Sequence, residues 1–300
     1  MIPPPPALSK FQKKISWEKV DQKEILNHLK LCVREDLGTV GDVTTSACNI
    51  AGNGVAKLVS REEMIICGLP LIGLIFQAFG INSIKTEILR QDGEKITKGT
   101  TIAKLVGKQS EILLVERTIL NFIQKLSGIS TSTNVYASIL ENKNVGLLDT
   151  RKTTPGLRIL EKYATTCGGG FTHRMGLYDR VLIKDNHLAS LGISSAKQFS
   201  AFLQRVKSQT ADLILEVEID SIEYLEPALI ANVDAVLLDN FSPSEVHEAM
   251  TINQERAVIE ASGGINLKNS KEFSEAHPHF ISTGAPIHTS RWLDIGLDWE

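Results

Sequence analysis

The chain has few cysteines and lacks the cysteine pairs that usually signal a metal site or a disulfide framework. Its four cysteines, Cys32, Cys48, Cys67 and Cys167, are scattered along 300 residues without any C-x-x-C spacing. This pattern argues against a zinc-binding motif and against a secreted, disulfide-bonded scaffold. Because unpaired cysteines suit a reducing compartment, the sequence predicts a cytoplasmic protein.

Long apolar segments are also missing. The longest apolar run, Met64 to Phe79, is interrupted by two glycines, a proline and a glutamine. A membrane-spanning helix needs about 20 predominantly apolar residues. We therefore interpret this run as part of a protein core and expect no membrane association.

An excess of positive charge is absent as well. The formal net charge is -3, whereas a nucleic-acid-binding domain is usually basic. Positive charge is instead concentrated in a few places, including Arg151–Lys152, His173–Arg174 and Lys184. This local concentration favours a small anionic ligand over a polymer, so we expect no nucleic-acid partner.

The first half of the chain carries short β-like runs separated by glycines. An amphipathic helix is predicted over Asp21–Arg34, followed by a turn-rich, acidic loop over Glu35–Thr45. A helix over Glu111–Leu126 is expected to end at Gly128, where the texture of the chain changes and a domain boundary is placed. The other expected elements are a solvated polyproline entry over Pro3–Pro6, strands over Val55–Ser60, Met64–Cys67, Thr86–Leu89 and Thr101–Val106, a tight connection over Asp92–Gly99, and a further helix over Ser130–Leu140.

The second half repeats one pattern. Apolar runs alternate with segments of helical character, and the last four runs are spaced by about 22 residues, which is typical of strand–helix units. One of these segments opens with Ser242, Pro243 and Glu245, an N-cap serine with a capping box, and Asp220–Glu223 offers a similar start. Such units predict an α/β barrel, complete or open, with an open doubly wound sheet as the alternative. The predicted strands are Val145–Leu148, Val181–Ile183, Leu213–Ile219, Ala235–Leu238, Ala257–Ile259 and His279–Ile281.

Polar residues follow every one of these predicted strands. In an α/β barrel the chemistry gathers at the carboxyl ends of the strands, and six polar strand ends with charges of both signs therefore indicate an active site. The residues concerned are Asp149, Arg151 and Lys152; Lys184 and Asp185; Glu216 and Glu218; Asp239 and Asn240; Glu260 and Ser262; Ser282 and Gly284.

The acidic residues at these ends allow two explanations. Glu216 and Glu218 lie two apart and share a face of their strand. With Asp239 they are able to hold Mg²⁺ through oxygen ligands, or they pair with strand-end arginine and lysine residues. Glycines after two late strands, in Ser262–Gly264 and Thr283–Ala285, favour phosphate binding through backbone N–H groups.

Three other interpretations fit less well. Cys167 lies beside Gly168–Gly170, but no histidine arrangement that would activate it as a nucleophile is evident. Lys184 follows an apolar strand, as a Schiff-base lysine does in barrel aldolases, yet its surroundings are too cationic. A biotin or lipoyl carrier needs two similar halves around an exposed lysine, and only one half is present.

The residues at these positions resemble the quinolinate phosphoribosyltransferase family. The motifs that carry the resemblance are long, occur in the expected order and extend over nearly the whole chain. They are Glu35–Gly38 with Gly41–Thr45, Glu116–Arg117 with Asn121, Asp149–Gly156, Gly168–Gly170 with His173–Arg174, Ile183–His187, Glu216–Glu218, Leu238–Asn240, Glu260–Ile265 and Asp294–Asp298.

The resemblance implies a fold and a reaction. The fold would be an N-terminal α/β sandwich domain, residues 1–128 joined by the tail 290–300, and an open α/β barrel, residues 129–289. The reaction would convert quinolinate and phosphoribosyl pyrophosphate, with Mg²⁺, to nicotinate mononucleotide, pyrophosphate and carbon dioxide in NAD biosynthesis. A homodimer would be the minimum functional unit, with larger assemblies left open.

The resemblance also implies residue roles. Arg151, His173, Arg174 and Lys184 would hold the two carboxylates of quinolinate, with Lys152 close to both substrates. Arg117 would enter the site from a neighbouring subunit. Glu218 and Asp239 would contact the ribose and its metal, so that Lys152, Lys184, Glu218 and Asp239 form the catalytic set. Binding of the 5-phosphate would fall to Ser262, Gly263, Gly264, Gly284 and His288.

Two alternatives within the same fold remain open. One is a related phosphoribosyltransferase that acts on nicotinate or another ring acid, and the other is a ligand sensor without turnover. The chain departs from the family pattern at Thr172, at an extra residue before Gly41, and at Pro286 in the last phosphate loop. These departures bear on loop structure and not on the reaction.

Overall fold

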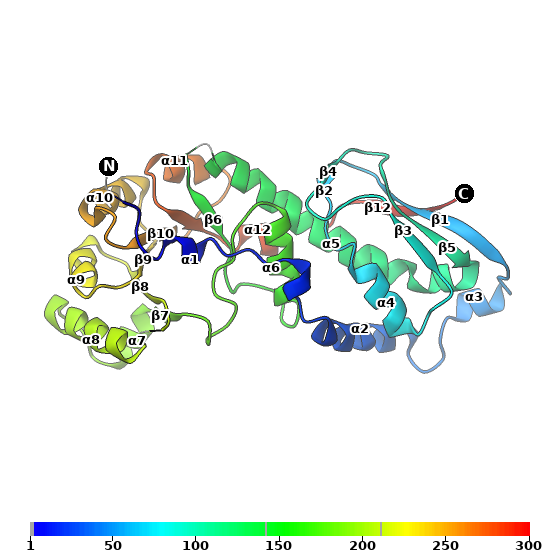
Figure 1. The fold of residues 1–300 in the computed structure, drawn as a ribbon, viewed down its shortest axis with the longest axis horizontal. Helices are drawn as coiled ribbons and strands as arrows, with labels where there is room; N and C mark the ends of the chain where they lie inside the picture. Colours follow the sequence, from blue (N-terminus) through cyan, green and yellow to red (C-terminus); the bar gives the residue numbers. More distant parts are fainter. Residues whose placement is uncertain (1–2, 142, 211) are drawn as a thin grey trace. The chain divides into compact units, whose positions relative to one another are not determined.

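The structure, a computed structural model, describes residues 3–141, 143–210 and 212–300. By compactness the chain divides into two units, which Figure 1 shows as a parallel sheet with its helices and an antiparallel sheet with its own. This division and the predicted one at residue 128 differ in where residues 3–14, 129–134, 154–169 and 289 belong. The first unit comprises Met1–Lys14, Val135–Thr153 and Gly170–His288, and the second comprises Ile15–Asn134, Thr154–Gly169 and Thr289–Glu300.

The first unit is built on six parallel strands in the order β6-β11-β10-β9-β8-β7. Strands β6 and β7 are the two ends of this order, so the predicted open α/β barrel is confirmed. Each strand coincides with one of the predicted apolar runs. The strands are β6 (Gly146–Leu148), β7 (Val181–Ile183), β8 (Leu215–Ile219), β9 (Ala235–Asp239), β10 (Val258–Ser262) and β11 (Phe280–Ser282).

Helices separate these strands, as the strand–helix pattern predicts. In α10 the Ser242 side chain accepts from the Glu245 N–H, the Glu245 side chain accepts in return, and Pro243 lies in the first turn, which confirms the predicted capping box. The similar start predicted at Asp220 is wrong, because a 3₁₀ turn over Ile222–Tyr224 without a side-chain cap precedes the next helix. The helices are α7 (Asp185–Ser190), α8 (Ala196–Gln209), α9 (Leu225–Ile230), α10 (Pro243–Asn253), α11 (Ser270–Glu275) and α12 (Ala285–His288).

The short helix α1 (Leu8–Phe11) covers the amino-terminal ends of the barrel strands. Phe11 is fully buried in a small apolar cluster with the first residues of three strands, Ala235, Val258 and Phe280. Its ring stacks on Phe280 at a centroid distance of 5.7 Å. Pro5 is buried as well, so the prediction of a fully solvated polyproline entry is wrong at that residue. With this end of the barrel filled, the carboxyl ends of the strands remain for a ligand.

The second unit contains an antiparallel sheet in the order β12-β1-β5-β3 and a short pair, β2 with β4. The last strand of the chain, β12, pairs with β1 in register from Ala56–Trp299 to Ser60–Ile295. The strands are β1 (Asn53–Ser60), β2 (Met64–Ile65), β3 (Lys85–Ile88), β4 (Lys95–Ile96), β5 (Thr101–Lys108) and β12 (Ile295–Trp299); the helices are η1 (Trp17–Lys19), α2 (Gln22–Leu37), α3 (Val43–Ala47), α4 (Leu71–Phe79) and α6 (Arg158–Cys167), and α5 (Gln109–Glu141) continues into the first unit.

The predicted break at Gly128 is wrong, since α5 is one helix of 33 residues. A Cβ atom at Gly128 would lie 2.1 Å from the carbonyl oxygen of Arg291. The glycine therefore allows a close approach of the C-terminal segment to the helix and does not end the helix. In the same way Glu35–Thr45 is only partly a loop, because α2 extends to Leu37 and Asp42 caps α3.

The connection predicted over Asp92–Gly99 contains β4, which pairs with β2. A helix able to span a bilayer is not found in the described part of the chain.

Candidate active site

A cavity of about 530 Å³ lies at the carboxyl ends of the barrel strands. Nine of the thirteen predicted site residues line it, which brings together residues that are up to 112 positions apart. Its lining consists of Thr150, Arg151, Lys152, His173, Arg174, Leu182, Lys184, Glu218, Leu237, Asp239, Glu260, Ser262, Gly263 and Ser282.

The cations come from the two edge strands. Arg151 and Lys152 follow β6, and Lys184 follows β7 as the N-cap of α7. The segment with His173 and Arg174 is tied to the end of β6 by a parallel bridge between Leu148 and Phe171.

The buried carboxylate of Asp149 fixes this segment. Its Oδ1 accepts from the His173 N–H at 2.9 Å, and its own N–H donates to the Phe171 carbonyl at 3.1 Å. Asp149 was predicted among the active-site residues at the strand ends. The structure shows that it instead holds His173 and Arg174 in the segment beside Arg151 and Lys152.

The acids come from the middle strands. Glu218 in β8 accepts a hydrogen bond from the Lys184 ammonium group. Asp239 ends β9, and its Oδ2 accepts from the Asn240 amide at 2.9 Å. In the parallel pairing of β8 and β9, Glu218 lies opposite Leu237, two residues before Asp239. The two carboxylates therefore face the same side of the sheet.

A buried charge cluster forms the floor of the cavity. Arg180 donates to Glu216 Oε2 at 2.9 Å, and its guanidinium lies 3.9 Å from the centre of the Phe11 ring. His173 Nε2 lies 3.4 Å from a carboxylate oxygen of Glu216 and 3.4 Å from one of Glu260. Glu216 and Glu260 are completely buried. Of the two explanations left open for Glu216, the structure supports pairing with a cation.

This cluster retains a proton at neutral pH. Burial disfavours a charged imidazole, but the carboxylates of Glu260 and Glu216 outweigh it and raise the pKa of His173 to about 9. Burial also raises the pKa of the Glu260 carboxyl group. Because His173 Nδ1 accepts from the Arg174 N–H at 2.8 Å, the ring proton lies on Nε2, between the carboxylates. With Nδ1 occupied as an acceptor, the second proton of the cluster lies on the Glu260 carboxyl group, and it is shared with His173 in the sense that the two groups titrate as a pair.

Glu216 behaves in the opposite way. Burial alone would raise the pKa of its carboxyl group, but Arg180 and then His173 lower it far below the ordinary range. The floor thus combines a permanent Arg180–Glu216 ion pair with a shared proton.

Glycines at the late strands expose backbone to the cavity. Gly263 has φ +93°, and a Cβ atom there would lie 2.3 Å from Asn240 Oδ1, so only glycine fits. Gly264 also has a positive φ, 63°. A Cβ atom at Gly284 would lie 3.0 Å from both Thr150 Oγ1 and His288 Cδ2. Gly264, Gly284 and His288 follow the same strand ends but do not line the cavity itself.

Comparison with known proteins identifies the family. A model described as the quinolinate phosphoribosyl transferase C-terminal domain matches residues 129–298, and one for the N-terminal domain of the same family matches residues 42–127. The chain belongs to the quinolinate phosphoribosyltransferase family.

Individual members of the family are similar over almost their whole length. The probable nicotinate-nucleotide pyrophosphorylase [carboxylating] of Bacillus subtilis is 37% identical over 277 residues, which is 92% of both chains. A protein of the same name from Methanocaldococcus jannaschii is 38% identical over 91% of this chain and 96% of its own. The solved nicotinate-nucleotide pyrophosphorylase structure from Francisella tularensis has a TM-score of 0.88 and 35% identity, and covers 94% of this chain and 98% of that one.

One predicted site residue lies in the second unit. Arg117 belongs to α5, its side chain is 64% exposed, and it lines a hollow of about 320 Å³ in that unit. The other residues of this hollow include His28, Asn121, Phe122 and Trp292. The family resemblance assigns Arg117 to the site of a neighbouring subunit.

The departures from the family pattern are accommodated by the structure. Thr172 is buried, and its N–H donates to the Lys13 carbonyl at 2.9 Å. Pro286 lies in the first turn of α12, where proline is tolerated because its missing N–H has no partner in the helix. Asp42 caps α3, with its Oδ1 accepting from the Thr45 N–H at 2.9 Å.

The sequence did not reveal Arg180 or the apolar walls of the cavity, Leu182 and Leu237. Arg180 precedes β7, and Leu182 of that strand pairs with Glu216. A correct register between β7 and β8 would have indicated that Arg180 lies beside this glutamate. Register depends on the whole sheet, and the apolar runs alone do not give it.

Proposed function

We propose that this protein is a quinolinate phosphoribosyltransferase, which converts quinolinate and phosphoribosyl pyrophosphate to nicotinate mononucleotide, pyrophosphate and carbon dioxide in NAD biosynthesis. Membership of the family supports the proposal. The observation that carries it is one 530 Å³ cavity lined by Arg151, Lys152, Arg174 and Lys184, a cationic set suited to a dicarboxylate. We also propose a cytoplasmic location, because unpaired cysteines suit a reducing compartment.

The cations have to overcome repulsion between two polyanionic substrates. We assign the two carboxylates of quinolinate to Arg151, Arg174 and Lys184, with His173 on the cavity floor and Lys152 between the acceptor and the donor. A hydrogen bond between a charged group and a carboxylate contributes about 1.5–3 kcal/mol. Several such bonds are needed, which accounts for the number of cations.

The reaction needs orientation more than a catalytic base. The ring nitrogen of quinolinate is the nucleophile, and it must be held in line with the sugar C1. As pyrophosphate leaves, positive charge develops on the sugar, and the carboxylates of Glu218 and Asp239 stabilise it. The pyridinium formed by the attack then accepts the electron pair of the bond between the ring and the neighbouring carboxylate as carbon dioxide departs, and the ring carbon takes up a proton from water.

Glu218 and Asp239 also suit Mg²⁺. This ion is usually held by one or two carboxylates together with substrate phosphates, and these two carboxylates face one side of the sheet at the cavity. Bound there, Mg²⁺ would neutralise charge on the departing pyrophosphate. The 5-phosphate is assigned to the late strand ends, at Ser262, Gly263, Gly264, Gly284 and His288.

A homodimer is part of the proposal. Arg117 is exposed on α5 and belongs to the second unit, not to the barrel unit, and we assign it to the active site of a neighbouring subunit. We propose the sandwich domain 1–128, with the tail 290–300, as the part of the chain that presents Arg117, and 129–289 as the catalytic barrel.

A product assay tests the proposal. Purified protein supplied with quinolinate, phosphoribosyl pyrophosphate and Mg²⁺ should release carbon dioxide and pyrophosphate in equal amounts. Turnover of nicotinate in preference to quinolinate, with no carbon dioxide, would favour the related phosphoribosyltransferase. Quinolinate binding without any product would favour the ligand sensor.

A further inference from the structure

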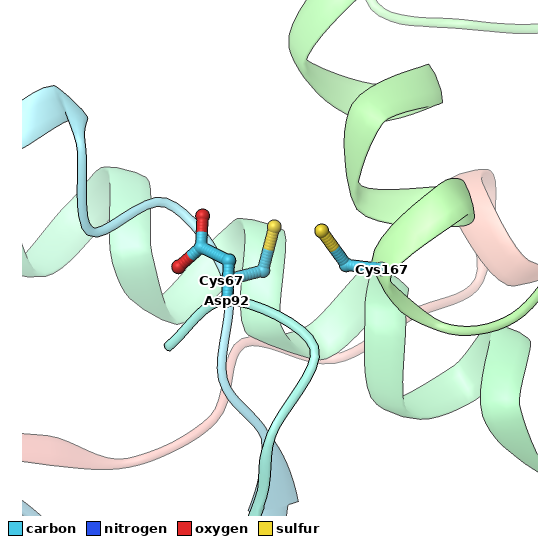
Figure 2. A group of neighbouring side chains, drawn as sticks. All are labelled: Cys67, Asp92 and Cys167. Carbon is cyan, nitrogen blue, oxygen red and sulfur yellow. The ribbon is translucent and has the colours of Figure 1, made fainter. Parts of the chain in front are cut away.

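A second cluster of ligand-type side chains lies in the other unit, apart from the residues used above. It consists of Cys67, Asp92 and Cys167, and one ligand atom from each lies within 4.8 Å of the other two. Figure 2 shows the two sulfur atoms directed toward one another beside the Asp92 carboxylate. Cys67 and Cys167 are 100 positions apart, so the absence of a C-x-x-C motif does not exclude a metal site here.

The backbone around the two cysteines is held firmly. The Cys67 N–H donates to Ser127 Oγ at 3.0 Å. Cys167 is the last residue of α6, and a Cβ atom at the next residue, Gly168, would lie 2.3 Å from the Ser130 carbonyl oxygen of α5. Both sulfur atoms are therefore presented from positions that packing fixes, as a binding site requires.

The Asp92 carboxylate is oriented by three donors. Its Oδ2 accepts from the Gly68 N–H and the Tyr163 hydroxyl group, both at 2.9 Å, and its Oδ1 accepts from the Leu69 N–H at 3.0 Å. A carboxylate has about four acceptor positions, so one remains on Oδ1 for a cation. Hydrogen-bonded carboxylates of this kind are typical of metal ligands, whose outer partners fix their direction.

We propose that Cys67, Cys167 and Asp92 form a binding site for a thiophilic divalent cation of the zinc class. Thiolate sulfur and carboxylate oxygen are both ligands of Zn²⁺, and water would complete the tetrahedron at the fourth position. A tetrahedral ion with bonds of about 2.3 Å to sulfur holds its ligand atoms roughly 3.5–3.8 Å apart. The three ligand atoms lie within 4.8 Å of one another, so binding requires their side chains to rotate toward one another to reach that spacing.

Binding is linked to proton release. The two thiols bind as thiolates, so each cation bound releases two protons. The affinity therefore increases with pH. The bound ion would join the end of α6 to the turn that precedes α4. Along the chain, residues 154–169 of the second unit lie between the stretch with Lys152 and the stretch with His173, which both belong to the first unit.

Cobalt substitution tests the site directly. The 300-residue protein is stripped with a chelator under reducing conditions and titrated with Co²⁺ and then with Zn²⁺. We expect one Co²⁺ per chain, with a thiolate-to-cobalt charge-transfer band and visible ligand-field bands of a tetrahedral ion. Zn²⁺ should abolish the bands and raise the melting temperature.

Variants distinguish this site from adventitious binding. Cys67→Ser, Cys167→Ser and Asp92→Asn should each weaken Co²⁺ binding by at least about 100-fold, and Tyr163→Phe, which removes an outer hydrogen bond, by about 10-fold. The control variant Cys32→Ser/Cys48→Ser, which removes the other two thiols, should bind as the parent does.

A parent-like cobalt spectrum in Cys167→Ser, or no cobalt band in the reduced parent, would overturn the proposal. Melting curves of the metal-free variants show whether each one is folded, and Asp92→Asn keeps the thiols in place. A fresh, unreduced protein with only two titratable thiols would identify the pair as a disulfide and would also overturn it.

Discussion

Arg174 is a single side chain to which we assign a role specific to the acceptor substrate. It is 8% exposed, lines the cavity, and its Nη1 donates to the Arg180 carbonyl at 3.3 Å. Burial and then the neighbouring Arg151 lower the pKa of its guanidinium. A negatively charged carboxylate in the cavity would relieve both effects, so Arg174 is well placed to bind one.

We predict that Arg174→Ala lowers kcat/KM for quinolinate by about 10- to 150-fold, the loss expected from one charge-assisted hydrogen bond of about 1.5–3 kcal/mol. The rate of carbon dioxide release measures the effect. Arg205→Ala is the matched control, because Arg205 is an arginine of α8 that lies over the Phe202 ring and not at the cavity. Equal rates for Arg174→Ala and the parent would remove Arg174 from the site.

The charge cluster beneath the cavity predicts a pH dependence of stability with two limbs. The folded pKa of His173 is about 9, above its ordinary 6.5, so its stabilising contribution is present below about 6.5 and is lost as the pH rises through 9. The folded pKa of Glu216 lies below its ordinary 4.5. Its contribution is therefore present above 4.5 and is lost as the pH falls below that value.

Glu260→Gln should flatten the alkaline limb only. Glutamine is neutral at every pH, so the variant has no carboxylate at that position to retain the proton shared with His173. The free energy of unfolding in urea, measured for parent and variant across the range from 6.5 to 9, checks this. Glu248→Gln, at an exposed position of α10, should keep the slope of the parent. An unchanged slope in Glu260→Gln would show that this glutamate does not share the proton.

At the level of helices and strands, the sequence predicts what depends on local pattern and fails where distant segments meet. All six barrel strands were found because buried parallel strands are continuous apolar runs, and α10 was found because its capping box is local. The end predicted at Gly128 was wrong, since that glycine accommodates Arg291 from the far end of the chain. Arg180 and the Cys67–Cys167 pair were missed for the same reason.

At two glycines of the second unit, substitution by alanine should have opposite effects on the stability of the protein. A Cβ atom at Gly168 would meet the Ser130 carbonyl oxygen at 2.3 Å and Thr133 Cβ at 2.6 Å. Gly168→Ala should therefore force α6 away from α5 and destabilise the protein by about 1–3 kcal/mol. At Gly73, inside α4, nothing lies within 4 Å, so Gly73→Ala should stabilise by about 0.5–1 kcal/mol. Urea unfolding of both variants measures the difference, and a neutral Gly168→Ala would mean that the two helices are free to separate.

For the whole molecule, the open barrel distributes charges of opposite sign over different strand ends of one cavity, and they meet in the Lys184–Glu218 ion pair between β7 and β8. The cations follow the edge strands β6 and β7, whereas the acids and the exposed glycines follow β8, β9 and β10 between them. In the proposed arrangement, an acidic acceptor and a phosphorylated donor meet different strands. The one predicted cation outside this arrangement, Arg117, belongs to the second unit, and it is the residue that decides whether one chain suffices.

Mixing two impaired variants tests this point. Arg117→Ala and Arg174→Ala should each be impaired as pure proteins. If Arg117 acts in the neighbouring subunit of a homodimer, a mixed dimer has one site with both arginines and one site with neither. Random exchange of subunits makes half of the dimers mixed, so the mixture should recover roughly one quarter of the parent activity. Recovery is measured as carbon dioxide release after co-refolding or co-expression. If Arg117 acts within its own chain, every site keeps one defect and no activity returns, and the dimeric site would then be excluded.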